Sequence, residues 1–127
     1  MRSIIEQGHT FEEWLTAGQI AADVKQVGQQ IRRDYEDKEP LFVIVLNGAF
    51  VFAADLIRAL DGLRCEQTFI RVSSYWGMSS TGQLEFIVPL QQVVENRDVI
   101  IVEDIVDTGL TIHQLKAHMR AHGASSV

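Results

Sequence analysis

The sequence predicts an α/β fold with a mostly parallel sheet flanked by helices, and two observations support this prediction. The segments Leu41–Leu46 (LFVIVL) and Asp98–Val102 (DVIIV) are almost wholly apolar, which is typical of strands buried at the centre of a parallel sheet. Helix-like and strand-like segments also follow one another along the chain, an order that favours right-handed crossovers. With 127 residues, 46% of them hydrophobic, we expect one domain over residues 1–127.

A helix is expected in the segment from Leu15 to Tyr35, because its apolar residues recur at helical spacing and would form one buried face. Thr16, followed three residues later by Gln19, resembles a capping box and should begin this helix. Pro40 closes the segment, since proline cannot continue a helix. The apolar residues of the face are Ile20, Val24, Val27, Ile31 and Tyr35.

The middle of the chain contains the next three expected elements. Residues 49–60, after an Asn-Gly break, are expected to form a mostly buried helix. Residues 66–72 and 83–88 are expected to be strands that could pair as a hairpin. The polar, glycine-containing segment 73–82 would connect them.

The end of the chain predicts a helix from Thr111 to His122, with Gly123 as its C-terminal stop. The four residues that follow, ASSV, resemble the approach to another strand. Because a crossover helix normally returns to its sheet, we expect the C-terminal part of a longer domain to be absent from this sequence.

Composition limits the possible partners and the compartment. Eleven basic and seventeen acidic residues give a net charge of -6, which argues against nucleic acid or an anionic membrane as the main partner. A small anionic ligand remains compatible with this balance. One cysteine, Cys65, cannot form an internal disulfide, and no apolar stretch has the length of a signal peptide or a membrane span. We therefore expect a soluble, cytoplasmic protein.

The stretch VIIVEDIVDTGLT, residues 99–111, combines acidic residues with a turn that suits an anion. Glu103 and Asp104 follow a buried strand, at the edge where open α/β sheets bind ligands. Asp107 comes next, and residues 108–111 lead into a helix whose N-terminus could bind phosphate. Carboxylates would repel a bare phosphate, but they suit sugar hydroxyls, Mg²⁺ and a cationic transition state at a sugar carbon. A phosphorylated ribose that reacts at its anomeric carbon meets all these conditions.

These residues resemble a known family. VIIVEDIVDTGLT is similar to the phosphoribosyl-pyrophosphate signature of type I phosphoribosyltransferases, in its purine-salvage form. LNGAFVFAADLIRAL resembles the pyrophosphate-binding loop and helix of hypoxanthine-guanine phosphoribosyltransferases, and RVSSYWGMSSTG resembles their mobile catalytic loop. The resemblance implies a type I phosphoribosyltransferase fold and extends from about Leu15 to the end of the chain.

The resemblance also implies roles for individual residues. Asp107 would be the catalytic group near N7 of the purine, accepting or donating a proton. Glu103 and Asp104 would hold the ribose hydroxyls and Mg²⁺, the implied cofactor. The 5′-phosphate would bind to the turn of Thr108, Gly109, Leu110 and Thr111. Pyrophosphate would contact Leu46, Asn47 and Gly48, with a strained peptide after Leu46. Ser74 and Tyr75 would belong to a lid that excludes water, although a hairpin tip with exposed aromatic residues is the alternative interpretation.

The implied activity is purine salvage, in which phosphoribosyl pyrophosphate and hypoxanthine or guanine give IMP or GMP and pyrophosphate. Two alternatives stay open: xanthine or another 6-oxopurine as the base, and a non-catalytic regulator that binds nucleotide on the same fold. The family's purine-reading elements lie beyond Val127, so the sequence does not choose among the bases. The resemblance further implies a homodimer or homotetramer.

The sequence departs from the family pattern at two positions. Many members have lysine where this chain has Asn47, so we expect weaker charge compensation for pyrophosphate. Leu110 replaces a residue that is often basic or polar, at a position where the loop uses its backbone.

Residues outside these motifs receive structural interpretations. His118 and His122 are spaced as a metal pair on a helix, but without a third ligand nearby they are interpreted as a solvated face. Cys65 is interpreted as a small buried apolar residue. The residues expected in the core are Trp14, Phe42, Phe50 and Phe52.

Overall fold

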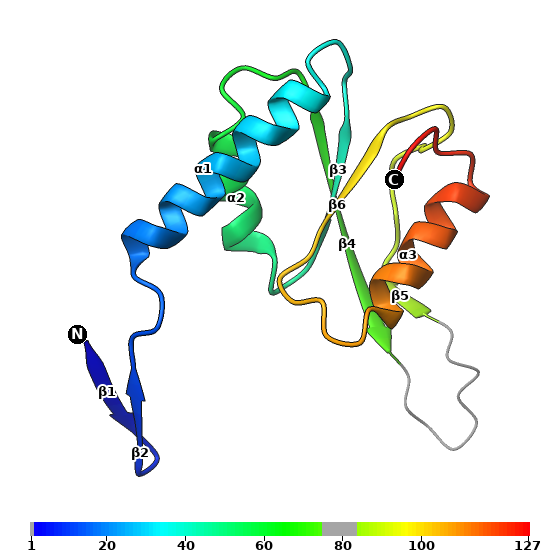
Figure 1. Cartoon of the computed structure of the whole chain (residues 1–127). Helices are drawn as coiled ribbons and strands as arrows, with labels where there is room; N and C mark the ends of the chain where they lie inside the picture. Colours follow the sequence, from blue (N-terminus) through cyan, green and yellow to red (C-terminus); the bar gives the residue numbers. More distant parts are fainter. Residues whose placement is uncertain (1, 75–83) are drawn as a thin grey trace.

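The computed structural model describes residues 2–74 and 84–127. A two-stranded antiparallel sheet of β1 (Ser3–Glu6) and β2 (His9–Glu12) comes first. The other elements are α1 (Ala17–Asp34), β3 (Leu41–Val45), α2 (Phe50–Arg58), β4 (Glu66–Ser74), β5 (Leu84–Val88), β6 (Val99–Val102) and α3 (Leu110–Ala121). Figure 1 shows the β1–β2 hairpin well apart from the rest of the molecule.

The main sheet has four strands in the order β5-β4-β3-β6. β3 pairs in parallel with β4 and with β6, whereas β4 and β5 pair antiparallel. The sheet is covered by α1 and α2 on one side and by α3 on the other (Figure 1). This architecture confirms the predicted α/β fold, the hairpin arm and the buried central strand β3. The same prediction was wrong for β6, which is last in the strand order and has Ile100 and Ile101 only partly buried.

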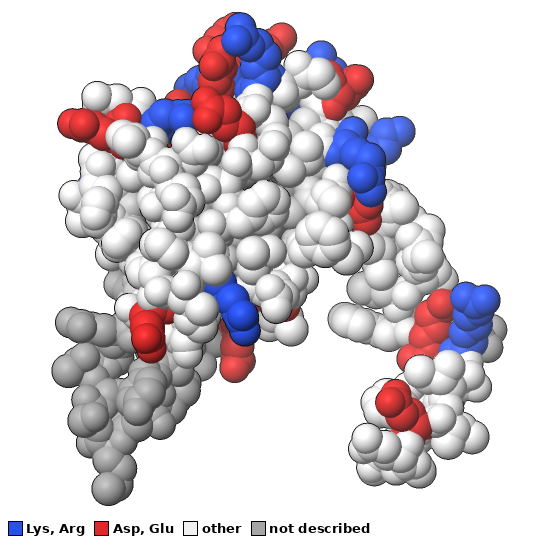
Figure 2. Space-filling view, turned by 180° about the vertical axis from the view of Figure 1, so that it is seen from behind, with Lys and Arg blue, Asp and Glu red and all other residues white. Residues whose placement is uncertain are grey.

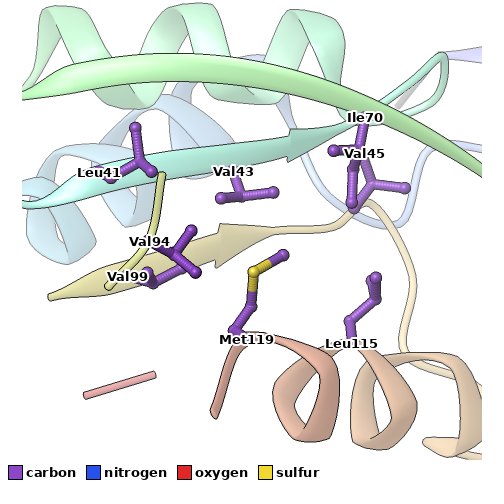
Figure 3. Packing of buried hydrophobic residues seen from close by; sticks show 8 residues of the cluster. All are labelled: Leu41, Val43, Val45, Ile70, Val94, Val99, Leu115 and Met119. Carbon is purple, nitrogen blue, oxygen red and sulfur yellow. The ribbon is translucent and has the colours of Figure 1, made fainter. Parts of the chain in front are cut away.

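Strand β3 is buried on both faces because each face packs against a different helical layer. Leu41, Val43 and Val45 belong to the core on the α3 side, where they are joined by Leu115 and Met119. Figure 3 shows these five side chains converging between the sheet and α3, together with Ile70, Val94 and Val99. All five β3 residues are at most 5% exposed, which is why the strand needs no polar alternation.

The opposite face of β3 packs against the other two helices. Phe42 and Ile44 form a second core cluster with residues of α2, and Val24 and Ile31 of α1 pack against it. The two helices approach closely at Gly28, where an added Cβ would lie 2.8 Å from both the Cβ and the carbonyl oxygen of Ala59. Gly28 therefore determines how near α1 can lie to α2.

Local signals determine where the helices begin and end. Helix α1 begins after Thr16, whose hydroxyl accepts the Gln19 N–H while the Gln19 side chain accepts the Thr16 N–H. This reciprocal pair confirms the predicted capping box. After α3, Gly123 adopts a positive φ of 90°, a conformation typical of a residue just past a helix end.

The residues after Gly123 return to the sheet. Ser126 forms a parallel bridge with Asp98, its carbonyl accepts the Val99 N–H at 2.9 Å, and its hydroxyl donates to Asp98 at 2.6 Å. The predicted approach to another strand beside β6 is confirmed.

Several sequence predictions about burial were wrong. Trp14 is 89% exposed because it lies on the connection between the separate hairpin and α1. Phe50 is 57% exposed because the buried side of this segment consists of Ala49, Ala53 and Leu56, and Phe50 is not on it. Only Phe42 is fully buried, and Phe52 is partly buried against the core. In α1, Ile20 and Val27 are 49% and 44% exposed, so the expected face is only partly covered.

Charged side chains of both signs gather around the loops that precede the strands. Figure 2 shows residues of both signs clustered at the top of the molecule, around the loops that precede the strands. Among these loops Arg64 pairs with Glu39 at 3.3 Å, and Arg97 pairs with Glu66 at 3.4 Å. In the part of the chain that the structure describes, no helix combines the length and apolar character that a membrane crossing requires.

Candidate active site

The candidate site lies at the carboxyl edge of the sheet, where β3 and β6 both end. The two strands run side by side in parallel with Ile44 opposite Val102, so the turns that follow them emerge next to each other. One turn contains Leu46, Asn47 and Gly48, and the other begins with Glu103. Both turns lie at the lower edge of the sheet in Figure 1. The fold thereby brings together two motifs that are more than fifty residues apart in the sequence.

A pocket of about 260 Å³ occupies the turn between β6 and α3. Its lining includes most of the residues that the sequence analysis assigned to the phosphoribosyl group, with Leu110 absent from the lining and 45% exposed. It also includes three apolar residues that the sequence analysis did not single out. The lining residues are Glu103, Asp104, Ile105, Val106, Asp107, Thr108, Gly109, Thr111 and Ile112.

Glu103 and Asp104 form a pair of neighbouring carboxylates. A carboxylate oxygen of Glu103 accepts the N–H of Asp104 at 3.0 Å, and Oδ1 of Asp104 accepts the N–H of Ile105 at 2.8 Å. Burial, followed by its side-chain hydrogen bond with Asp104, raises the pKa of Glu103 to about 7. The hydrogen bond with Glu103, followed by the Ile105 N–H, lowers the pKa of Asp104. The pair therefore retains a proton near neutral pH, as neighbouring carboxylates commonly do.

This pair fits a divalent cation. Mg²⁺ prefers oxygen ligands and is commonly bound by one or two carboxylates, with waters and substrate phosphates completing its shell. A cation between Glu103 and Asp104 would favour ionisation of both groups and would counteract the rise in the pKa of Glu103. Within residues 2–74 and 84–127, no group of three or more histidine, cysteine or acidic residues could hold a metal alone.

The turn before α3 has features that suit a phosphate. Gly109 adopts a positive φ of 82° and is the N-cap residue of the helix, a conformation that glycine adopts without steric cost. The hydroxyl of Thr108 accepts the N–H of Leu110 at 3.3 Å, and the first turn of α3 contains no acidic residue. The helix therefore presents the positive end of its dipole to the pocket.

The turn after β3 contacts the carboxylate pair directly. The peptide bond between Leu46 and Asn47 is cis, and the carbonyl of Asn47 accepts the Phe50 N–H at 3.2 Å. A Cβ added at Gly48 would lie 2.7 Å from Cγ of Asp104 and closer still to its Oδ2. The residues assigned to pyrophosphate and to ribose are thus in van der Waals contact.

The predicted lid is only partly described. Ser74 is the last residue of β4, and its backbone pairs with Leu84 of β5. Tyr75 lies outside the described residues, so the prediction of a Ser-Tyr lid stays a prediction.

Comparison with known proteins identifies the family. Residues 11–127 match the family described as phosphoribosyl transferase domain. The chain belongs to the phosphoribosyltransferase family. The predicted family resemblance and fold class are therefore confirmed.

Among curated relatives of this chain, the hypoxanthine-guanine phosphoribosyltransferase of Streptococcus thermophilus is 42% identical over 109 residues, which are 85% of this chain and 60% of the relative. The hypoxanthine-guanine-xanthine phosphoribosyltransferase of Tritrichomonas foetus is 38% identical over 108 residues, which are 85% of this chain and 58% of the relative. A crystal structure of a Bacillus anthracis hypoxanthine-guanine phosphoribosyltransferase, 37% identical, superimposes with a TM-score of 0.84 over 91% of this chain and 69% of that one. The chain spans about 60% of the length of its curated relatives.

The sequence analysis missed the apolar part of the site. Ile105 and Val106 are 74% and 61% exposed although they line the pocket. The sequence contained a signal for them, namely two aliphatic residues between acidic positions at a strand end. An acidic loop that is merely solvated has no need of aliphatic residues, so their presence could have indicated a ligand contact. A larger groove of about 790 Å³ lies between α1 and α2, but it is on the helical layer and not at the strand ends.

Proposed function

We propose that this phosphoribosyltransferase acts in purine salvage, transferring 5-phosphoribose from phosphoribosyl pyrophosphate to hypoxanthine or guanine. IMP or GMP and pyrophosphate would be the products. The observation that carries the proposal is the contact between two motifs at one edge of the sheet: the Gly48 turn lies against Asp104 of the carboxylate pair. The names of relatives at 37–42% identity support the choice of base.

The proposed reaction exchanges one bond at the anomeric carbon for another. The bond from this carbon to a pyrophosphate oxygen breaks, a bond to a purine nitrogen forms, and the purine loses a proton. Asp107 lines the same pocket as the carboxylate pair and would accept this proton near N7 as a general base. Glu103 and Asp104 would stabilise the positive charge that develops on the ribose ring, because negatively charged carboxylates held in fixed positions attract it.

The remaining residues would bind and orient the substrates. Thr108, Gly109 and Thr111, with the N-terminus of α3, would bind the 5′-phosphate. Leu46, Asn47 and Gly48 would bind pyrophosphate, and Asn47 supplies an amide donor there without positive charge. Holding both ends of one substrate would orient its anomeric carbon, which lowers the entropic part of the barrier.

Mg²⁺ fits the proposed reaction. When bound, it would neutralise the charge that develops on the pyrophosphate leaving group. Glu103 and Asp104 are the residues that would hold it, directly or through water. The raised pKa of Glu103 supports a site built to receive a cation.

A broader base specificity is a second candidate. The Tritrichomonas foetus relative carries xanthine in its name and is nearly as similar to this chain as the Streptococcus thermophilus relative. Competition of equal concentrations of the three bases for one supply of phosphoribosyl pyrophosphate would rank them by kcat/KM.

A non-catalytic nucleotide-binding regulator is the third candidate. Such a protein would need the phosphate turn but no general base. The presence of Asp107 in the pocket lining therefore favours the enzyme.

The deciding experiment mixes the full-length protein with Mg²⁺, phosphoribosyl pyrophosphate and each purine base in turn. We expect the nucleotide and pyrophosphate to appear with hypoxanthine or guanine. Product with xanthine alone would move the assignment to the second candidate. Absence of product with every base, in a protein that still binds nucleotide by calorimetry, would favour the regulator.

A further inference from the structure

We propose that Gly48 is a positioning residue for the carboxylate of Asp104. Because position 48 has no Cβ, the turn after β3 lies directly against this carboxylate and fixes its orientation in the site. The inference rests on the proposed function, since it concerns how one group of that site is held in place.

The contact at Gly48 differs in kind from other close glycine contacts in the described chain. The three heavy atoms nearest to an added Cβ would be Cγ and the two carboxylate oxygens of Asp104, all of them in one side chain. Position 48 is also outside the left-handed region of φ. An alanine there would therefore keep its backbone conformation and displace one functional side chain.

The Asp104 side chain needs such a restraint because burial does not supply one. The residue is exposed, so its carboxylate would otherwise sample several rotamers. Three contacts hold it. The side chain has a hydrogen bond with Glu103, the Ile105 N–H donates to Oδ1 at 2.8 Å, and Gly48 lies against Cγ and Oδ2. Together they fix the plane of the carboxylate before substrate binds, which is the preorganisation that active sites require.

The contact also joins two parts of the proposed site. Gly48 belongs to the turn proposed for pyrophosphate, and Asp104 belongs to the pair proposed for ribose and Mg²⁺. A ligand that orders the turn would therefore also order the carboxylate. The leaving group and the ribose would be positioned by one shared contact between neighbouring strands.

The size of the displacement can be estimated. Carbon atoms in contact usually lie about 3.5–4.0 Å apart, whereas Cγ of Asp104 would be 2.7 Å from a Cβ at position 48. The carboxylate would thus have to move by roughly 1 Å, and displacements of about this size can reduce turnover roughly a hundredfold. Since Asp104 is exposed, it can move into solvent without disturbing the core.

The test compares Gly48→Ala with Gly18→Ala by steady-state kinetics and by NMR of the full-length protein. Gly18 is the matched control, because a Cβ there would meet only the Thr16 hydroxyl at 3.9 Å. We expect Gly48→Ala to lower kcat by about 10- to 100-fold while the KM for the purine base stays within about threefold. The Ile105 amide resonance should shift in Gly48→Ala and stay in place in Gly18→Ala. An unshifted Ile105 resonance would overturn the contact itself, whether or not the protein is active.

A double-mutant cycle separates the positioning role from a direct contact of Gly48 with pyrophosphate. In an Asp104→Ala background the displaced carboxylate is gone, so adding Gly48→Ala should cost less than about twofold in kcat. The same cost in both backgrounds would overturn the positioning role. If Gly48→Ala does not fold alone, recovery of folding by Asp104→Ala would support the contact, and failure of both would refute it. An inactive wild-type protein would refute the proposed function, whereas an active wild type with an equally active Gly48→Ala refutes the positioning role alone.

Discussion

Two glycines of this chain make close contacts with opposite consequences. Gly28 allows α1 to lie against α2, where an added Cβ would meet backbone atoms of Ala59. Gly48 allows a turn to lie against Asp104, where the atoms nearest to an added Cβ would belong to an exposed carboxylate. The first contact is part of the packed layers and the second is part of the candidate site. The comparison indicates that stability resides in the helix-covered sheet, while the carboxyl edge can change its chemistry with little effect on folding.

The largest expected effect tests the packed layers. Phe42 is fully buried between β3 and the α1–α2 layer, so Phe42→Ala should lower the free energy of unfolding by about 3–5 kcal/mol. Phe50→Ala is the matched control because Phe50 is 57% exposed, and it should cost well under half as much. Chemical denaturation measures both. Equal losses of unfolding free energy in the two variants would contradict the expectation that the buried Phe42 contributes more to stability than the exposed Phe50.

The corresponding change at the edge should affect turnover and leave folding intact. Asp107 is exposed and lines the pocket, so Asp107→Asn should reduce kcat by about 10²- to 10⁴-fold, the usual contribution of a general base. Its thermal midpoint should match that of the wild type. Steady-state kinetics with saturating substrates give the effect, and Asp23→Asn on the exposed surface of α1 is the control.

A proportional loss of substrate affinity in Asp107→Asn would contradict this expectation. In that case Asp107 would only position the ligand and would not transfer the proton.

Gly28→Ala is the direct counterpart of the change at Gly48. Because the neighbouring atoms at Ala59 include backbone, the helices must separate, and overpacking of this kind costs about 1–3 kcal/mol of unfolding free energy. Gly18→Ala, in the same helix and without close neighbours, should be neutral or slightly stabilising, since alanine favours helix. Denaturant midpoints compare the two. If Gly28→Ala lowers kcat without lowering stability, the proposed difference between a stability role for Gly28 and a site role for Gly48 is wrong.

The sequence predicted the packed layers well because their signals are local and repeated. The unbroken apolar run of β3, the Thr16–Gln19 capping box and the stop at Gly123 each follow from short-range chemistry. The acidic strand end and the turn into α3 could be predicted for the same reason, since they occupy one continuous stretch of residues 99–111. Phosphate binding by this turn stays a prediction.

The contacts between distant segments could not be predicted in the same way. The approach of Gly48 to Asp104 depends on the pairing of β3 with β6, which no local pattern specifies. The β1–β2 hairpin was missed because its strands are short and exposed on all sides. For Trp14 and Phe50, large apolar residues were assumed to be buried, although apolar atoms also make up much of an ordinary protein surface.

The pH dependence of stability should differ in sign between the two regions. At the edge, the pKa of Glu103 is raised from 4.5 to about 7, so the folded protein binds this proton more readily than the unfolded chain. Stability from this group is present below pH 4.5 and is lost as the pH rises through about 7. Glu103→Gln should remove that part of the dependence in metal-free buffer, as measured by denaturation between pH 4.5 and 8. An unchanged slope would show that Glu103 titrates normally.

On the α3 side of the sheet the smallest expected effect has the opposite sign. The ring centroid of His118 lies 4.8 Å from that of Phe86 and 4.2 Å from that of His122. The predicted solvated face therefore holds for His122, which is exposed, and only in part for His118, which is partly buried. Burial first, and then the charge of His122, lowers the pKa of His118 below 6.5. The unfolded chain therefore binds this proton more readily, and stability should fall as the pH drops through about 6.5.

Partial exposure keeps this effect modest, because solvent screens the charge. The carboxylate of Glu95, which lines the same pocket as both histidines, would oppose it by favouring the charged ring. His118→Gln should flatten the acid limb of the stability curve, whereas His113→Gln, on an exposed position of the same helix, should leave it intact. If both variants flatten the acid limb equally, the environment of His118 does not determine how stability changes with pH.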